Sequence, residues 1–130
     1  MTFLRPFAPQ LLSVLRIMAG LLLLQHGTAK YLSFPFVERM ANASPMSMSG
    51  AAGLIELVFG ILLVIGLFTR FSAFIASGMT AVAYFYAHAG RNFFPIVNQG
   101  ELAALYSFVF LYIAAAGGGP WSVDSARGSD

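Results

Sequence analysis

The sequence predicts an all-α membrane protein, an antiparallel bundle of four transmembrane helices. Of its 130 residues, 58% are hydrophobic and only 9% are charged, and the mean hydropathy is +0.79. Soluble domains carry about 25% charged residues, so this chain has too few charges to cover a surface that faces water. Four apolar stretches have nearly the length that a helix needs to cross a bilayer. We expect these spans at residues 11–32, 50–68, 71–89 and 99–116 of a single domain, 1–130.

Three connections separate the spans, at residues 33–49, Thr69–Arg70 and residues 90–98. The first is rich in polar residues and proline, and its segment 35–41 fits a short helix lying in the membrane interface. Ala41–Ala43 imitates a signal-peptidase site, but the apolar run before it is longer than that of ordinary signal peptides. We therefore expect the first span to be retained. The second connection is short enough to force an antiparallel helical hairpin.

Four spans place both termini on one side of the membrane. The positive-inside rule favours cytoplasmic termini by a margin of one charge. The Lys and Arg residues on or near the terminal side are Arg5, Arg16, Arg70 and Arg127, and those of the other side are Lys30, Arg39 and Arg91.

Composition and motifs exclude several function classes. The seven Lys and Arg residues are scattered and the net charge is only +2, so no surface for nucleic acid is expected. The chain has no cysteine, which rules out thiol chemistry and disulfides within it. It carries no phosphate-binding loop, dinucleotide fingerprint or Ser-His-Asp constellation.

Ionisable residues inside the spans are the informative ones, because each is costly in a bilayer unless it is paired or hydrated. In an antiparallel bundle, five of them fall toward the same membrane face: His26, Lys30, Glu56, His88 and Glu101. Glu56 lies about 9 Å below its helix end, too deep for its short side chain to reach water, and Lys30 is its best partner. A polar layer inside one half of the bundle is the favoured interpretation. Purely structural ion pairs remain the alternative.

Three further features refine this interpretation. Gly20, Gly53 and Gly60 offer small surfaces that permit close helix approach around Glu56. Arg16 belongs to the opposite half and is interpreted as a residue whose side chain extends to the lipid head groups. The Glu-x-x-His spacing of di-iron bundles is absent and the two histidines differ in depth, so neither haem nor a metal is expected.

The sequence resembles the DoxX family of small bacterial membrane proteins. The resemblance rests on the order of four motifs: HG-x-x-K in the first span, E-x-x-x-G followed by GLFTR, NQGE, and the terminal GGGPWSVD. It implies a four-helix inner-membrane protein and offers quinone or redox involvement as a lead, because the family is named after a subunit associated with quinone-linked sulfur oxidation. The positions that match its polar pattern, which are candidates for ligand binding or proton relay, are His26, Lys30, Glu56, His88, Asn98 and Glu101. The resemblance transfers no catalytic role to them.

The favoured function is a redox-accessory subunit that binds a quinone-like or other small amphiphile in the polar layer. Quinone is the cofactor considered. The partners considered are the lipid bilayer, a redox protein and a second copy of the chain. One alternative is a non-enzymatic membrane anchor or assembly subunit, and another is a proton-linked transporter, since a buried Glu beside His can relay protons. The chain has no self-contained catalytic motif.

Overall fold

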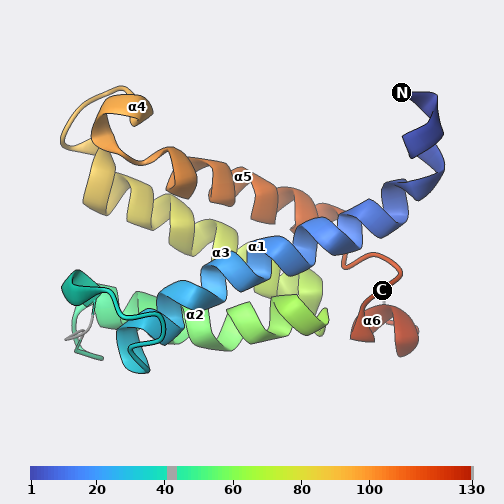
Figure 1. Ribbon diagram of the computed structural model, residues 1–130, viewed down its shortest axis with the longest axis horizontal. Coiled ribbons are helices and arrows are strands. Elements are labelled where there is room, and N and C mark those ends of the chain that lie inside the picture. Colours follow the sequence, from blue (N-terminus) through green and yellow to red (C-terminus); the bar gives the residue numbers. More distant parts are fainter. Residues whose placement is uncertain (41–43, 130) are drawn as a thin grey trace.

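The computed structural model describes residues 1–40 and 44–129, and their regular structure is entirely helical. The all-α class is thereby confirmed. The long helices are α1 (Ala8–Tyr31), α2 (Met48–Ile65), α3 (Thr69–Tyr84) and α5 (Glu101–Ala116), and Figure 1 shows them lying lengthwise. The shorter elements are a 3₁₀ turn at Thr2–Phe7, another at Glu38–Met40, a π-helical turn η3 (Phe85–Ala89), α4 (Pro95–Asn98) and α6 (Val123–Ala126).

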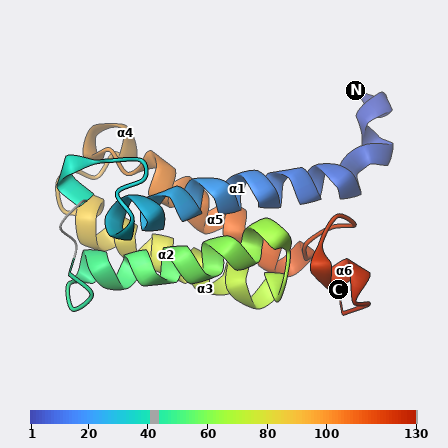
Figure 2. The same cartoon turned by 60° about the horizontal axis from the view of Figure 1, so that its bottom comes forward.

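The long helices pack mainly in two pairs, α1 with α2 and α3 with α5, and a smaller contact between α2 and α3 joins the pairs. In Figures 1 and 2 the α1–α2 loop and α4 lie at one end of the molecule. We call this the loop end, with residues 32–40, 44–47 and 85–100. The α2–α3 connection and α6 lie at the other end, which we call the C-terminal end, with residues 66–68 and 117–129. The N and C labels both stand at the C-terminal end in these views.

Glycines allow α1 and α2 to pack with their backbones in close contact. A Cβ atom built on Gly27 would lie 2.8 Å from the Leu57 backbone nitrogen, and one on Gly60 would lie 2.9 Å from the Leu24 Cα. Gly20 is confined in the same way against the Val64 backbone, at 3.0 Å. The predicted role of small residues in close helix approach is therefore confirmed.

The outer surface of the helices is apolar. Large hydrophobic side chains are exposed along all four long helices, including Leu21, Val58, Phe74, Phe108 and Tyr112. Soluble monomers rarely expose apolar patches of this extent, which indicates contact with a lipid bilayer. Among the described residues, Thr2–Tyr31 and Met48–Ile65 are long and apolar enough to cross a membrane, while α5 is apolar but shorter.

The α2–α3 connection differs from the sequence prediction. The turn consists of Gly66–Phe68 rather than Thr69–Arg70, and Thr69 already begins α3. Gly66 ends α2 with φ = 75°, a left-handed conformation that glycine adopts without strain. The carboxylate of Asp124 accepts hydrogen bonds from the backbone N–H groups of Phe68 and Thr69, at 2.9 and 2.8 Å. A distant residue therefore fixes the start of α3.

Other boundaries shift by a few residues. α1 begins at Ala8, with Pro9 in its first turn, where a missing N–H costs nothing. The third span is α-helical only to Tyr84 and continues as η3. Of the short interfacial helix predicted for residues 35–41, the described residues form only the 3₁₀ turn Glu38–Met40. The signal-peptidase-like Ala41–Ala43 lies outside the described residues.

Arg16 is buried rather than directed to lipid head groups, so that prediction was wrong. Its side chain is 1% exposed, and its guanidinium donates to the carbonyl oxygens of Gly118 at 2.6 Å and Trp121 at 2.8 Å. Ser13 reinforces the contact, since its hydroxyl donates to Gly118 O and accepts from Trp121 N–H, both at 3.0 Å. The C-terminal segment folds back over α1, which brings backbone acceptors to the arginine.

Candidate functional site

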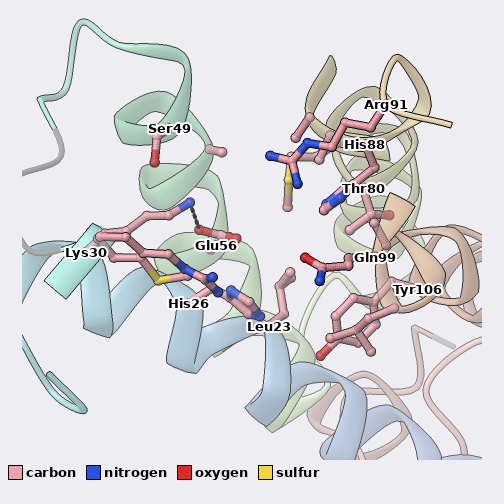
Figure 3. A pocket seen from close by; sticks show the side chains of 18 residues that line it. Leu23, His26, Lys30, Ser49, Glu56, Thr80, His88, Arg91, Gln99 and Tyr106 are labelled. Atoms are coloured by element: carbon pink, nitrogen blue, oxygen red, sulfur yellow. Dashed lines mark hydrogen bonds and ion pairs between the residues drawn. The ribbon is translucent and has the colours of Figure 1, made fainter. Parts of the chain in front are cut away.

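A cavity of about 500 Å³ lies between the long helices at the loop end (Figure 3). Side chains from α1, α2, α3, η3 and α5 line it, together with residues of the loops. Its polar and ionisable lining residues on the helices are His26, Lys30, Ser49, Glu56, Thr80, His88 and Tyr106, and those outside them are Arg39, Arg91 and Gln99.

A buried ion pair forms one wall of the cavity. Lys30 Nζ lies 2.8 Å from Glu56 Oε1, and the two side chains are 9% and 7% exposed. Close packing at Gly53 brings Lys30 within reach, because a Cβ on Gly53 would lie 2.9 Å from the Lys30 Cδ. The sequence-based prediction that Glu56 faces other helices and pairs with Lys30 is confirmed. Each charge depends on the other, because a lone charge at this depth would be strongly unfavourable.

His26 lies one helical turn before Lys30 on α1 and lines the same cavity (Figure 3). Its ring makes no hydrogen bond to any described residue. An imidazole carries one nitrogen that donates and one that accepts in its neutral form. His26 can therefore offer either kind of hydrogen bond to a bound molecule.

His88 reaches the cavity from the π-helical turn η3, where the backbone departs from the regular α-helix. Such turns recur at functional sites because they re-aim a side chain. His88 Nδ1 lies 3.1 Å from the carbonyl oxygen of Asn98. Asn98 is itself fully buried and donates to the Tyr84 hydroxyl at 3.1 Å and the Asn92 carbonyl at 2.9 Å. Asn98 therefore builds the wall that positions His88 and does not line the cavity.

Glu101 is exposed in the first turn of α5 and does not line the cavity. A carboxylate there interacts favourably with the N-terminal end of the helix. Of the six candidate residues predicted from sequence, the structure thus gathers four around the cavity: His26, Lys30, Glu56 and His88.

Sequence reasoning missed Tyr106 and Gln99, which lie on the α5 side of the cavity in Figure 3. Tyr106 is 7% exposed, its ring stacks on Phe110, and its hydroxyl has no hydrogen-bond partner in the described part of the chain. Buried hydroxyls are nearly always bonded, so this one is available to a ligand. Gln99 precedes α5 and has a left-handed backbone with φ = 62°, so helical spacing could not have placed it beside Tyr106.

An apolar groove of about 600 Å³ runs between α2 and α3 and adjoins the cavity. It is lined by residues such as Ile55, Phe74, Ile75 and Val82. Six residues line both spaces: Lys30, Ser49, Ala52, Met79, Ala83 and Ala87. The cavity and the apolar groove are therefore adjacent, with these six residues between or beside them.

In residues 1–40 and 44–129, no three His, Asp or Glu side chains are grouped closely enough to hold a metal ion. The expectation that the protein uses neither haem nor a metal stays a prediction.

An all-helical chain with an apolar exterior and a cavity lined by ionisable side chains has the character of a membrane protein, and the comparisons with known proteins specify which kind. The model of the DoxX family matches residues 11–89. A Haemophilus influenzae protein described only as uncharacterized is 45% identical over 131 residues, covering 96% of each chain. This chain belongs to the DoxX family, as the motifs predicted. No solved structure matches it.

Proposed function

We propose that this protein is a single-domain, multi-pass protein of the bacterial inner membrane that binds a small amphiphile, such as a quinone, as an accessory subunit of a redox system. Its four spans would be α1, α2, α3 with η3, and α5, antiparallel and with cytoplasmic termini. The observation that supports this proposal most is that the cavity and the apolar groove lie side by side and share six lining residues. A molecule with a polar head and an apolar tail needs both spaces side by side.

The head group would meet hydrogen-bonding groups on opposite walls. His26 on α1 and the Tyr106 hydroxyl on α5 both lack partners among the described residues. A quinone carries a carbonyl at each end of its ring, and each carbonyl accepts one donor of this kind. Gln99 beside Tyr106 adds an amide that can donate or accept.

The tail would lie between α2 and α3, where the exposed Phe74 and Val82 open the groove toward the exterior. A hydrophobic molecule dissolved in the bilayer could then enter laterally, without crossing water. Glu56 and Lys30 would place a carboxylate and an ammonium group beside the head group, where both side chains are largely shielded from water.

Native mass spectrometry of the protein extracted with surrounding lipid tests this proposal. We expect a small amphiphile to remain bound to the wild type and to dissociate more readily from Tyr106→Phe. Tyr112→Phe is the matched control, because Tyr112 is on the same helix but is 61% exposed. A stoichiometric partner protein with no bound amphiphile would support the anchor function instead. Proton flux into vesicles that Glu56→Gln abolishes would support the transporter.

A further inference from the structure

The charges that line the cavity do not balance. Three cations contribute, Lys30, Arg39 and Arg91, against the single carboxylate of Glu56. Lys30 and Glu56 neutralise each other at 2.8 Å. The described lining therefore keeps an excess of two positive charges, both of them guanidinium groups.

No other carboxylate in the described residues compensates the two arginines. Glu38 and Glu101 do not line the cavity, and neither forms an ion pair with Arg39 or Arg91. Asp124 caps α3 at the C-terminal end. The last of the five acidic residues, Asp130, lies outside the described residues.

The two arginines approach the cavity from different loops. Arg39 belongs to the turn Glu38–Met40 between α1 and α2, and Arg91 follows η3. In Figure 3 the Arg91 side chain reaches across the cavity toward the Lys30–Glu56 pair. A planar guanidinium presents paired N–H donors that match the two oxygens of a carboxylate or phosphate. Two guanidinium groups beside one cavity select for an anion.

The α2–α3 groove offers space for the alkyl chain of a ligand. Gly78 is on α3 in this groove, and a Cβ built there would meet no atom within 4 Å. The groove is therefore open at Gly78, in contrast to the close contacts at the α1–α2 glycines. A larger side chain at position 78 would occupy the groove without displacing the backbone.

We propose that the occupant of this site is a single-chain amphiphile whose head group is an anion, a carboxylate or phosphate, held by Arg39 and Arg91 with its chain in the α2–α3 groove. This inference rests on the proposed function of the cavity and specifies the class of ligand.

The test is a set of binding titrations on the full-length protein in nanodiscs of zwitterionic lipid. The probes share one chain length: dodecyl phosphate and dodecanoate as anions, and 1-dodecanol as the neutral amphiphile. Decylubiquinone represents the neutral quinones, and inorganic phosphate represents the anion without a chain. We expect both anionic amphiphiles to bind about tenfold more tightly than 1-dodecanol, since two partly exposed ion pairs together contribute about that factor. Inorganic phosphate should bind more weakly than dodecyl phosphate.

Charge and groove are then tested separately. The double variant Arg39→Gln/Arg91→Gln should lose the preference for anions and keep its affinity for 1-dodecanol. Arg5→Gln/Arg127→Gln removes the same charge from outside the cavity and should keep the preference. Gly78→Leu should weaken binding of every chain-bearing probe, whereas Gly90→Leu, at another glycine with open space around it, should not. Thermal unfolding midpoints verify that each variant is folded.

Equal affinity of the wild type for anionic and neutral probes would overturn the inference. So would a preference for anions that survives in the Arg39→Gln/Arg91→Gln variant. Either result would leave the proposed function standing if Gly78→Leu still weakened binding of the neutral amphiphiles. If no chain-bearing probe binds the wild type, decylubiquinone included, the proposed function fails together with the inference.

Discussion

The two ends of the molecule each bury a cation of α1, but they satisfy it in different ways. At the C-terminal end, Arg16 donates to backbone carbonyls of Gly118 and Trp121. At the loop end, Lys30 has one carboxylate partner and lies beside a cavity. Polar groups satisfied by backbone make a rigid structural contact, whereas unpartnered polar groups around a cavity are suited to a ligand.

The C-terminal segment packs closely against α1. A Cβ on Gly119, whose φ is 78°, would lie 2.3 Å from the Ser13 Oγ, and one on Gly66 would lie 2.5 Å from an Arg16 nitrogen. The C-terminal segment thus has no spare volume where it contacts α1. Substitutions that break a buried hydrogen bond or ion pair should alter stability at either end, whereas substitutions of the unpartnered groups around the cavity should alter binding.

The largest expected effect is on stability at the C-terminal end. Arg16→Met leaves the carbonyls of Gly118 and Trp121 without their donor in a buried site, so we expect a loss of about 3 kcal/mol in the free energy of unfolding. Arg16→Lys should recover little of the lost stability, because an ammonium group cannot reproduce the planar arrangement of donors in a guanidinium group. Thermal and denaturant unfolding in detergent measure this, with Arg5→Met, at an exposed position, as the control. Unchanged stability in Arg16→Met would remove the distinction between the two ends.

An effect of similar size is expected for the Lys30–Glu56 pair. Glu56→Gln and Lys30→Met should each destabilise the protein by about 3 kcal/mol, because each leaves one buried charge unpaired. The double variant should recover most of that loss, since no lone charge remains. A double-variant cycle of thermal melts gives the coupling. If Glu56→Gln keeps full stability and abolishes amphiphile binding, the pair serves the ligand rather than the fold.

The smallest effect is a pH dependence at Asp124, outside the proposed spans. Burial alone would raise the pKa of this carboxyl, but hydrogen bonds from Thr69 and the Phe68 N–H, with the charge of Arg127, hold the pKa below its usual range. The stabilisation is therefore present above about pH 4 and is lost as the pH falls through the lowered pKa. Asp124→Asn should cost about 1 kcal/mol at pH 7 and progressively less as the pH falls below about 4, measured as the difference in melting temperature from wild type. A difference that stays constant with pH would show that the charge of Asp124 contributes nothing.

The sequence predicted the parts of this structure that depend on side-chain type and helical spacing. Lys30 and Glu56 could be paired from depth and charge, and the small size of Gly20 and Gly60 indicated close helix packing. Arg16 could not be placed, because its acceptors are backbone carbonyls supplied by a segment more than 100 residues away. A pattern of side chains does not reveal such acceptors.

The cavity was predictable only in part. The sequence selected His88 as a candidate, but not the backbone geometry that brings it to the cavity. His88 acquires its position from the π-helical turn, which changes the helical phase that sequence spacing assumes. Tyr106 lies in an apolar stretch where a lone tyrosine has no evident direction. The two motifs GLFTR and GGGPWSVD were recognised separately, yet Asp124 of the second caps the helix that begins within the first.

The most direct measurement is an experimental structure of the protein in native lipid, at a resolution that shows bound amphiphiles. We expect density for a polar head in the cavity lined by His26, Arg91 and Tyr106, with an alkyl chain in the α2–α3 groove, and no comparable density around Arg16. A cavity filled by the protein's own side chains, with α2 and α3 closed against each other, would contradict the proposed binding of an amphiphile.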